Sequence, residues 1–152
     1  MAAGNWTVYQ AAKLSLTQGA INLTSGAANI ACVLVAAAYT PAPTTDSTYA
    51  NISGNEITGT GYTAGGQIIT SETDAAAGGT VTFTSAAVSW ASSTITAKWA
   101  VLVYRAAAGT AASTDKLLCY VDLNTASGSS TVSTTAGTFT ITMSGSGIFT
   151  LA

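Results

Sequence analysis

Residues 59–66 carry a glycine cluster, GTGYTAGG, whose spacing could hold a phosphate. Residues 59–64 match the dinucleotide-binding pattern G-x-G-x-x-G/A, and residues 61–66 have the glycine spacing of a P-loop. A dinucleotide site needs these glycines to open a helix, because the pyrophosphate rests on the first amides of that helix. Here they precede the strand-like run QIIT, and Gln67 and Ile68 stand where a P-loop needs Lys and Ser/Thr. We therefore expect a glycine-rich bend between strands.

Paired carboxylates are a second source of chemistry. Glu72 and Asp74 lie two positions apart, which in a strand would direct both side chains to one face, and Asp115 precedes Lys116 in a predicted turn. Glycosidases place two carboxylates across a cleft, and the six acidic residues of this chain offer few such pairs. We expect these acids to be solvated loop charges. A hydrolase with an unrecognised site at Glu72 or Asp74 stays open as an alternative.

The sequence offers few residues for nucleophilic catalysis or for metal binding. Histidine is absent, so a serine triad has no base, and the motif G-x-S-x-G does not occur. A Ser–Lys dyad that uses Lys13, Lys98 or Lys116 remains open, but no motif supports it. A zinc site would need scattered carboxylates, because the two cysteines are isolated. The sequence predicts a protein that is not an enzyme and has no cofactor.

Low charge is the most informative feature of the composition. Only 7% of the 152 residues are charged, against about 25% in an ordinary soluble domain. The net charge of -2 provides no basic stripe for a nucleic acid, and the longest apolar run, Ile30–Tyr39, is too short to span a membrane. The N-terminus shows no secretory signal, which favours synthesis in the cytoplasm. A free monomer needs surface charge for solubility, so we expect an assembled subunit.

The two cysteines lie in apolar, strand-like runs. Cys32 occurs in IACVLV and Cys119 in KLLCYVDL. One disulfide would be compatible with this pair, but buried free thiols are favoured for a protein made in a reducing compartment.

The hydrophobic pattern predicts one helix followed by strands. Residues 5–19 are expected to form the helix, with Asn5 as N-cap, Gly19 as stop, and Trp6, Tyr9, Ala12 and Leu16 on one face. Threonine alternating with β-branched or aromatic residues is typical of sheet surfaces. The predicted strands are Ile30–Tyr39, Gln67–Ser71, Thr80–Thr84, Thr94–Tyr104, Leu117–Leu123, Thr138–Met143 and Ile148–Leu151.

The connections carry turn residues, which favours an all-β fold. Both prolines lie in YTPAPTTDST, AAAGG precedes a strand, and NTASGSSTVSTTAG is read as a flexible polar stretch. The spacing predicts one domain over residues 1–152, an antiparallel β-sandwich or jelly-roll-like fold. Residues 1–20 would form a short N-terminal helix or arm, and residues 125–152 a C-terminal hairpin extension with its turn at residues 144–147.

Aromatic residues cluster in the segment VSWASSTITAKWAVLVYR, which holds Trp90, Trp99 and Tyr104. Alternate residues of the predicted strand 94–104 are mostly apolar on both faces, so this strand is either central to the fold or meets another subunit. Core packing is the expected role of its rings. A platform that stacks on sugars is the alternative.

Several stretches resemble a set of small tailed-phage virion proteins. They are NWTVYQAAKLSLTQGAINL, VLVAAAYTP, TYANISGNEITGTGYTAGGQ, VSWASSTITAKWAVLVYR and LLCYVDLN. The resemblance covers residues 5–124, and its most specific part is the pattern N-E-[IV]-x-G-x-G-Y-x-x-G-G at residues 55–66. The tail from Thr125 to Ala152 departs from the pattern.

This resemblance implies a structural virion protein, and within that class a capsid decoration or cement protein. Such a protein would sit on the capsid surface as a homotrimer and bind the major capsid protein. A carbohydrate-binding fibre-tip or adhesin module is the alternative. Aromatic side chains dominate interface energetics, so the expected anchors are aromatic. They are Trp6, Tyr9, Tyr39, Tyr49 and Tyr62.

Overall fold

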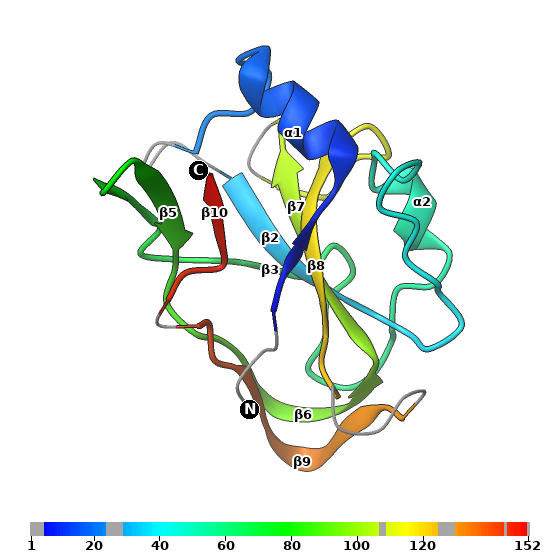
Figure 1. The fold of residues 1–152 in the computed structure, drawn as a ribbon. Helices are drawn as coiled ribbons and strands as arrows, with labels where there is room; N and C mark the ends of the chain where they lie inside the picture. Colours follow the sequence, from blue (N-terminus) through cyan, green and yellow to red (C-terminus); the bar gives the residue numbers. More distant parts are fainter. Residues whose placement is uncertain (1–4, 24–28, 107–108, 125–129, 145, 152) are drawn as a thin grey trace.

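The computed structural model describes residues 5–23, 29–106, 109–124, 130–144 and 146–151. In this part of the chain the structure is mostly β, with antiparallel sheets and a short N-terminal helix, as predicted (Figure 1). The elements are β1 (Thr7–Val8), α1 (Gln10–Thr17), β2 (Asn29–Val35), α2 (Ala50–Ser53), β3 (Gln67–Ile68), β4 (Thr73–Ala77), β5 (Thr80–Thr84), β6 (Val88–Ala97), β7 (Trp99–Arg105), β8 (Lys116–Asp122), β9 (Val132–Ile141) and β10 (Phe149–Leu151).

A five-stranded sheet forms the centre of the fold, in the order β1-β8-β7-β2-β3. The register of β2 against β7 runs without interruption from Asn29 opposite Arg105 to Val35 opposite Trp99. Both strands are apolar at successive positions, and nearly all of their side chains are buried. Of the two roles left open for the strand with two apolar faces, β7 has the first: it is central to the fold, and both of its faces are covered.

The predicted strand 94–104 is two strands. β6 and β7 are separated at Lys98, whose N–H donates to the carbonyl of Val35 at 3.0 Å and whose carbonyl accepts from the N–H of Leu123 at 2.9 Å. These bonds hold Lys98 between the ends of two neighbouring strands. β6 then leaves the central sheet and pairs with β9, as the lower part of Figure 1 shows.

The helix starts later than predicted. Asn5 is not its N-cap: α1 begins at Gln10, and Tyr9 occupies the N-cap position without a side-chain cap. The reason is that Thr7 and Val8 pair with β8, and the N–H of Tyr9 continues that ladder to the carbonyl of Leu118 at 3.0 Å. Gly19 is confirmed as the stop signal, since it follows the C-cap with φ +67°.

The C-terminal segment is not a separate hairpin. β9 pairs with β6, whereas β10 pairs with β5, so the chain passes from one sheet to another between them. β9 also extends well into the stretch that was read as flexible. Its serine and threonine hydroxyls bond across to β6, at 2.9 Å between Ser89 and Thr140 and at 2.8 Å between Thr96 and Ser133. Gly145 of the predicted turn and residues 125–129 lie outside the described residues.

β4 is a strand that the sequence pattern missed. Its register with β5 runs without interruption from Thr73 opposite Thr84 to Ala77 opposite Thr80. Gly78 and Gly79 connect the two strands with φ +59° and +84°, as a tight hairpin turn requires. The turn in AAAGG is therefore confined to the glycines, and the alanines before it belong to the strand.

Apolar residues from all three sheets pack into one core. Cys32 and Cys119 lie in it on opposite sides of Leu102, with which both are in register. Their Cα atoms are thus two strand spacings apart, about 10 Å, which is beyond the reach of a disulfide. Both thiols are free, as predicted. In the described ranges there is no helix long and apolar enough to cross a membrane.

Candidate functional site

The glycine cluster forms a folded loop that leads into a strand. Gly66 is followed by β3, as predicted, and Gly59, Gly61, Gly65 and Gly66 all have positive φ. A Cβ on Gly66 would collide with the carbonyl of Cys32 in β2. The glycines therefore allow the loop backbone to pass directly against the central sheet.

Glu56 is the hub of this loop. Its Oε1 accepts hydrogen bonds from the Tyr62 hydroxyl at 2.6 Å and from the N–H of Gly65 at 2.7 Å, and its Oε2 accepts from the Tyr49 hydroxyl. The Tyr62 hydroxyl in turn accepts the N–H of Leu34 at 3.0 Å. The Glu56 carboxylate thus connects the start of the loop to Gly65 near its end and, through Tyr62, to Leu34 near the end of β2.

These bonds explain the residue types at positions 55–66. Within residues 55–66 the acid, the tyrosine and the glycines hold one another, and the Glu56 carboxylate is occupied by three donors. Burial raises the pKa of Tyr62 well above its ordinary value, and the nearby Glu56 charge and hydrogen bond raise it further. The phenol stays protonated as a donor, so this cluster stabilises the loop.

Arg105 and Asp115 hold neighbouring loops in the same way. The buried guanidinium of Arg105 donates to the carbonyl of Gly65 and, at 2.6 Å, to that of Gly109. Asp115 accepts the N–H of Ala112 at 2.7 Å. The prediction that Glu72, Asp74 and Asp115 are solvated loop charges is therefore wrong for Asp115, which is buried and hydrogen-bonded to its loop, and for Glu72, which is also buried.

Glu72 and Asp74 do not form an open acid pair. Glu72 is 8% exposed and precedes β4, whereas Asp74 lies in β4 and is exposed. Among the described residues there is also no cluster of three or more His, Cys, Asp or Glu that could hold a metal ion.

A second hydrogen-bond network begins at Tyr9 in the core. The Tyr39 hydroxyl donates to Asp46 at 2.6 Å and lies 2.9 Å from the Tyr9 hydroxyl, which must therefore donate to it. Tyr9 is fully buried and Tyr39 is 6% exposed. Both were expected as interface anchors, but their side chains pack inside the chain and leave little surface for a partner. Tyr39 also lies beyond the end of β2, in the turn that follows it.

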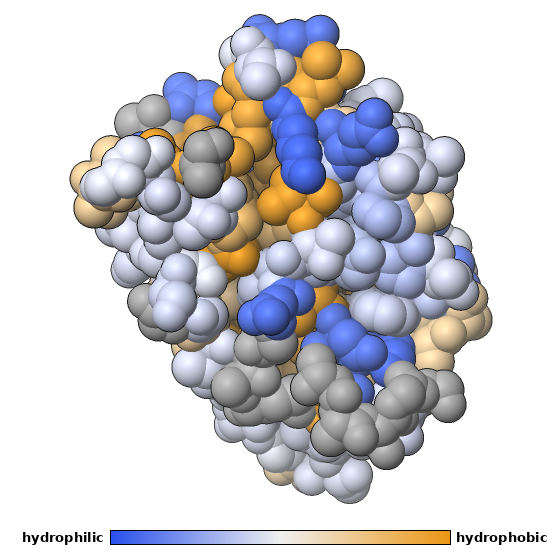
Figure 2. Space-filling model, viewed as in Figure 1, coloured by the Kyte–Doolittle hydropathy of each residue, from blue (hydrophilic) through white to orange (hydrophobic). Residues whose placement is uncertain are grey.

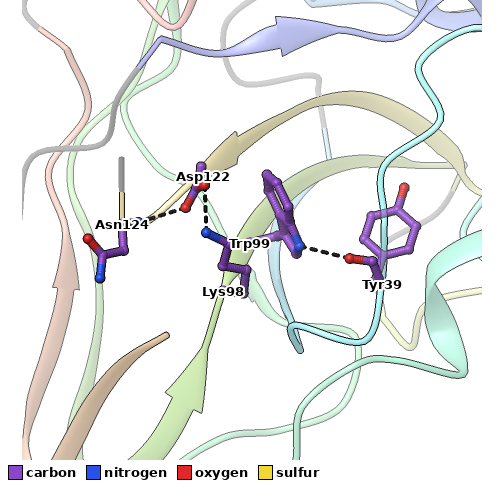
Figure 3. A network of polar contacts seen from close by, with 5 residues as sticks. All are labelled: Tyr39, Lys98, Trp99, Asp122 and Asn124. Carbon is purple, nitrogen blue, oxygen red and sulfur yellow. Dashed lines mark hydrogen bonds and ion pairs between the residues drawn. The ribbon is translucent and has the colours of Figure 1, made fainter. Parts of the chain in front are cut away.

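The bend between β6 and β7 carries a largely buried ion pair. Lys98 Nζ lies 2.7 Å from Asp122 Oδ2, and the two side chains are 4% and 26% exposed. Asp122 Oδ1 also accepts the N–H of Asn124 at 2.8 Å, while the neighbouring Trp99 indole donates to the carbonyl of Tyr39 at 3.0 Å (Figure 3). This network joins β7, β8 and the segment after β2.

The surface of the described part of the chain carries almost no charge. All ten charged residues lie in the described part of the chain: four are buried, four are partly buried, and two are exposed. The buried ones are Glu72, Lys98, Arg105 and Asp115. The exposed ones are Lys13 on α1 and Asp74 on β4. The small number of charges in the sequence is thus reduced further at the surface, because the fold uses most of them as internal hydrogen-bond partners.

Apolar side chains stand on this neutral surface. Leu14 on α1 is 58% exposed, and Val81 and Leu151, directly opposite each other on β5 and β10, are 39% and 42% exposed. Ile68 on β3 is 38% exposed. Figure 2 shows apolar side chains on the face that carries α1 and β10, including the hollow between β10 and the β1–α1 segment.

A hollow of about 340 Å³ lies between the N-terminal segment and the chain around β10. Asn5, Trp6 and Val8 line it on one side, and Ser144, Ser146–Thr150 on the other. Trp6 is partly buried, as are Tyr49 and Tyr62, so these three of the predicted anchors keep some exposed surface. The hollow brings an aromatic ring and several hydroxyl side chains together from opposite ends of the chain.

The hydrogen-bond hubs at Glu56, Asp46 and Asp115 were missed from the sequence. A signal was present, because acids are scarce here and three of them lie within loops rich in glycine, proline or threonine. Such loops leave backbone N–H groups without partners, and a carboxylate satisfies them. Comparison with known families, with curated proteins and with solved structures gives no match.

Proposed function

We propose that the chain is a non-enzymatic structural protein of a tailed-bacteriophage virion, a decoration or cement protein on the capsid surface. It would bind the major capsid protein as a homotrimer and stabilise the shell, with a β-sandwich of jelly-roll type as its framework. The resemblance at residues 55–66 suggests the virion class. The observation that carries the proposal is the neutral surface, on which only Lys13 and Asp74 are exposed charged residues.

A surface of this kind suits an assembled subunit. Soluble monomers carry many charges of both signs, which keep them apart and discourage sheet edges from pairing. In this chain most of the few charges instead bond internally, as Glu56 and Asp46 do. A stable interface covers about 800 Å² on each partner, which would remove much of the exposed apolar area of a small protomer from water.

The proposed mechanism is clamping. Each copy would span neighbouring shell subunits, so that separating those subunits exposes both sets of contacts to water. The exposed Leu14 and Val81 and the partly buried Trp6 are the side chains best placed to contribute contact area. Nucleic acid is an unsuitable partner, since Lys13 is the single exposed cation among the described residues.

Cosedimentation tests this proposal. Purified protein would be mixed with empty shells of the phage that encodes the chain, assembled without the protein, and the bound fraction measured after sedimentation. We expect saturable binding, a higher melting temperature of the shells, and weaker binding by Leu14→Lys or Val81→Lys. Ala91→Lys, at an exposed alanine of β6, is the matched control. Shells that bind no protein at high concentration, or that bind all variants equally, would contradict the proposal.

The hollow beside Trp6 favours one second candidate, a saccharide-binding module of a fibre tip or adhesin. Its volume of about 340 Å³ lies in the range of small-ligand sites, and an aromatic ring with nearby hydroxyls suits a sugar. A glycan array probed with the purified protein tests it. Binding that is lost in Trp6→Ala and retained in Trp99→Phe would support this candidate, and an array without signal would exclude it.

A further inference from the structure

β4 is an open sheet edge. It is the last strand of the three-stranded sheet β10-β5-β4, all five of its residues are exposed, and in the described part of the chain its outer side has no strand partner. It runs in unbroken register with β5, at the outer left of Figure 1. An unpaired edge presents a row of backbone N–H and C=O groups that pair readily with another strand.

Other edges carry features that hinder pairing. β1 and β3 are two residues long and β10 is three. β6 and β9 pair through register shifts and hold Ser92 and Ala136 in positive-φ conformations. Short strands and bulges are established ways of protecting an edge. β4 lacks both features, and it contains no proline or lysine.

We infer that β4 docks against β4 of a second copy of this chain, as an antiparallel pair about a two-fold axis at Ala75. In this register Thr73 lies opposite Ala77 of the other copy, Asp74 opposite Ala76, and Ala75 opposite its own equivalent. No like charges face each other directly, and the small side chains allow close approach of the strands. A pairing of this kind is self-complementary, as a two-fold interface must be.

The residues around β4 are compatible with a second copy of the chain as its partner. Ala76 lies opposite Val81, and Val81 lies opposite Leu151, so an exposed apolar row crosses the sheet at the same level. Pairing would join the two sheets into one of six strands and bring the two apolar rows close together. The contact area of a five-residue strand is small, well under the roughly 800 Å² per partner of a stable interface. The dimer should therefore be weak and reversible.

This inference goes beyond the proposed virion role and does not depend on it. If the chain forms trimers, a two-fold contact would link copies that belong to neighbouring trimers, because a three-fold axis cannot relate a strand to itself in this way. The pairing is measured on purified protein without shells, so its failure and the failure of shell binding can be told apart.

Sedimentation over a wide range of protein concentration tests the pairing. We expect a reversible doubling of mass, and amide-exchange protection of residues 73–77 that grows with concentration. Ala75→Lys places two cations opposite each other and should raise the dissociation constant about fivefold. Ala75→Glu should do the same, whereas an equimolar mixture of the two variants should recover the pairing as mixed dimers.

Two further variants sharpen the result. Asp74 and its equivalent would lie diagonally, about 8 Å apart, so Asp74→Asn or added salt should strengthen the dimer. Ala91→Lys is the control for an added charge elsewhere on the surface and should leave the dimer unchanged. The inference is overturned if no doubling occurs at any concentration, if Ala75→Lys and Ala91→Lys act alike, or if the amides of residues 73–77 gain no protection as mass increases.

Discussion

The Tyr62 hydroxyl lies 2.6 Å from Glu56 Oε1 and at the same time accepts the N–H of Leu34 at 3.0 Å. A single phenol thus connects the acid of the glycine-rich loop to the end of the central strand β2. These hydrogen bonds hold the loop against the central sheet. Loss of this hydroxyl would leave the Leu34 N–H without its partner, which costs more than the bond itself contributes.

Tyr62→Phe removes this connection while keeping the ring. We expect the free energy of unfolding to fall by about 1–2 kcal/mol, because the Leu34 N–H and a Glu56 oxygen both lose a partner. Urea denaturation measures the change. Tyr104→Phe is the control, since the structure shows no hydrogen bond of the Tyr104 hydroxyl among the described residues. Equal effects of the two substitutions would contradict the role assigned to Tyr62.

Gly66→Ala and Gly78→Ala separate backbone strain from steric collision. Both glycines have positive φ, but only at Gly66 would a Cβ meet another strand, at the carbonyl of Cys32. Gly78→Ala should lower the free energy of unfolding by about 1 kcal/mol, the usual penalty for a residue with a Cβ at positive φ. Gly66→Ala should cost clearly more and lower the melting temperature further. A Gly66→Ala protein as stable as Gly78→Ala would show that the loop does not pack against β2.

Substitutions at Lys98 and at Asp122 should lower the free energy of unfolding by different amounts. Asp122→Ala removes the carboxylate 2.7 Å from a cation that is 4% exposed, and should lower the free energy of unfolding by about 3 kcal/mol, the lower end for buried pairs because Asp122 is 26% exposed. Lys98→Met removes the buried charge itself and should lower the free energy of unfolding by less than Asp122→Ala does. Denaturant unfolding of both variants and of the double mutant measures the coupling. Additive effects would indicate that the pair contributes nothing as a pair.

The two thiols should be inert in the folded protein. Burial raises the pKa of Cys32 to about 12 and raises that of Cys119 well above its ordinary value, so neither forms a thiolate at neutral pH. Mass spectrometry after treatment with an alkylating reagent should show no label under native conditions and two labels after unfolding. Rapid native labelling, or a loss of two hydrogens that indicates a disulfide, would contradict the arrangement on either side of Leu102.

Alkaline pH should destabilise the fold through its buried phenols. Burial is the largest cause that raises the pKa of Tyr9, followed by its hydrogen bond to Tyr39. The folded chain therefore keeps a proton that the unfolded chain releases above pH of about 10, so stability is full below that pH and falls above it. The slope for one such phenol is about 1.4 kcal/mol per pH unit. Denaturant unfolding from pH 8 upward measures it.

Tyr9→Phe provides the control for this pH dependence. It should lower stability at neutral pH, because the hydrogen bond to the Tyr39 hydroxyl is lost, and should make the alkaline fall less steep. An unchanged slope would show that Tyr9 does not contribute to the pH dependence.

The sequence by itself determined the local and the compositional features of this protein. Alternation of threonine with apolar residues predicted β5 at its observed bounds, and the continuous apolar runs around Cys32 and Leu102 predicted two central strands. Both signals are local, because side chains alternate between the two faces of a strand and each apolar face must be covered. The glycines before Gln67 were likewise recognised as a bend, since neither a helix nor a lysine follows them.

Tertiary structure alone decided where those elements pair and which charges reach the surface. Thr7 and Val8 became a strand because β8 offered them an edge, and β4 formed from residues of weak strand propensity because β5 lies beside it. The division of one apolar run at Lys98 depends on bonds to Val35 and Leu123, which are distant in sequence. The roles of Glu56, Asp46 and Arg105 follow from the same cause, since a loop's unpaired backbone groups find their partners only when distant segments are brought together.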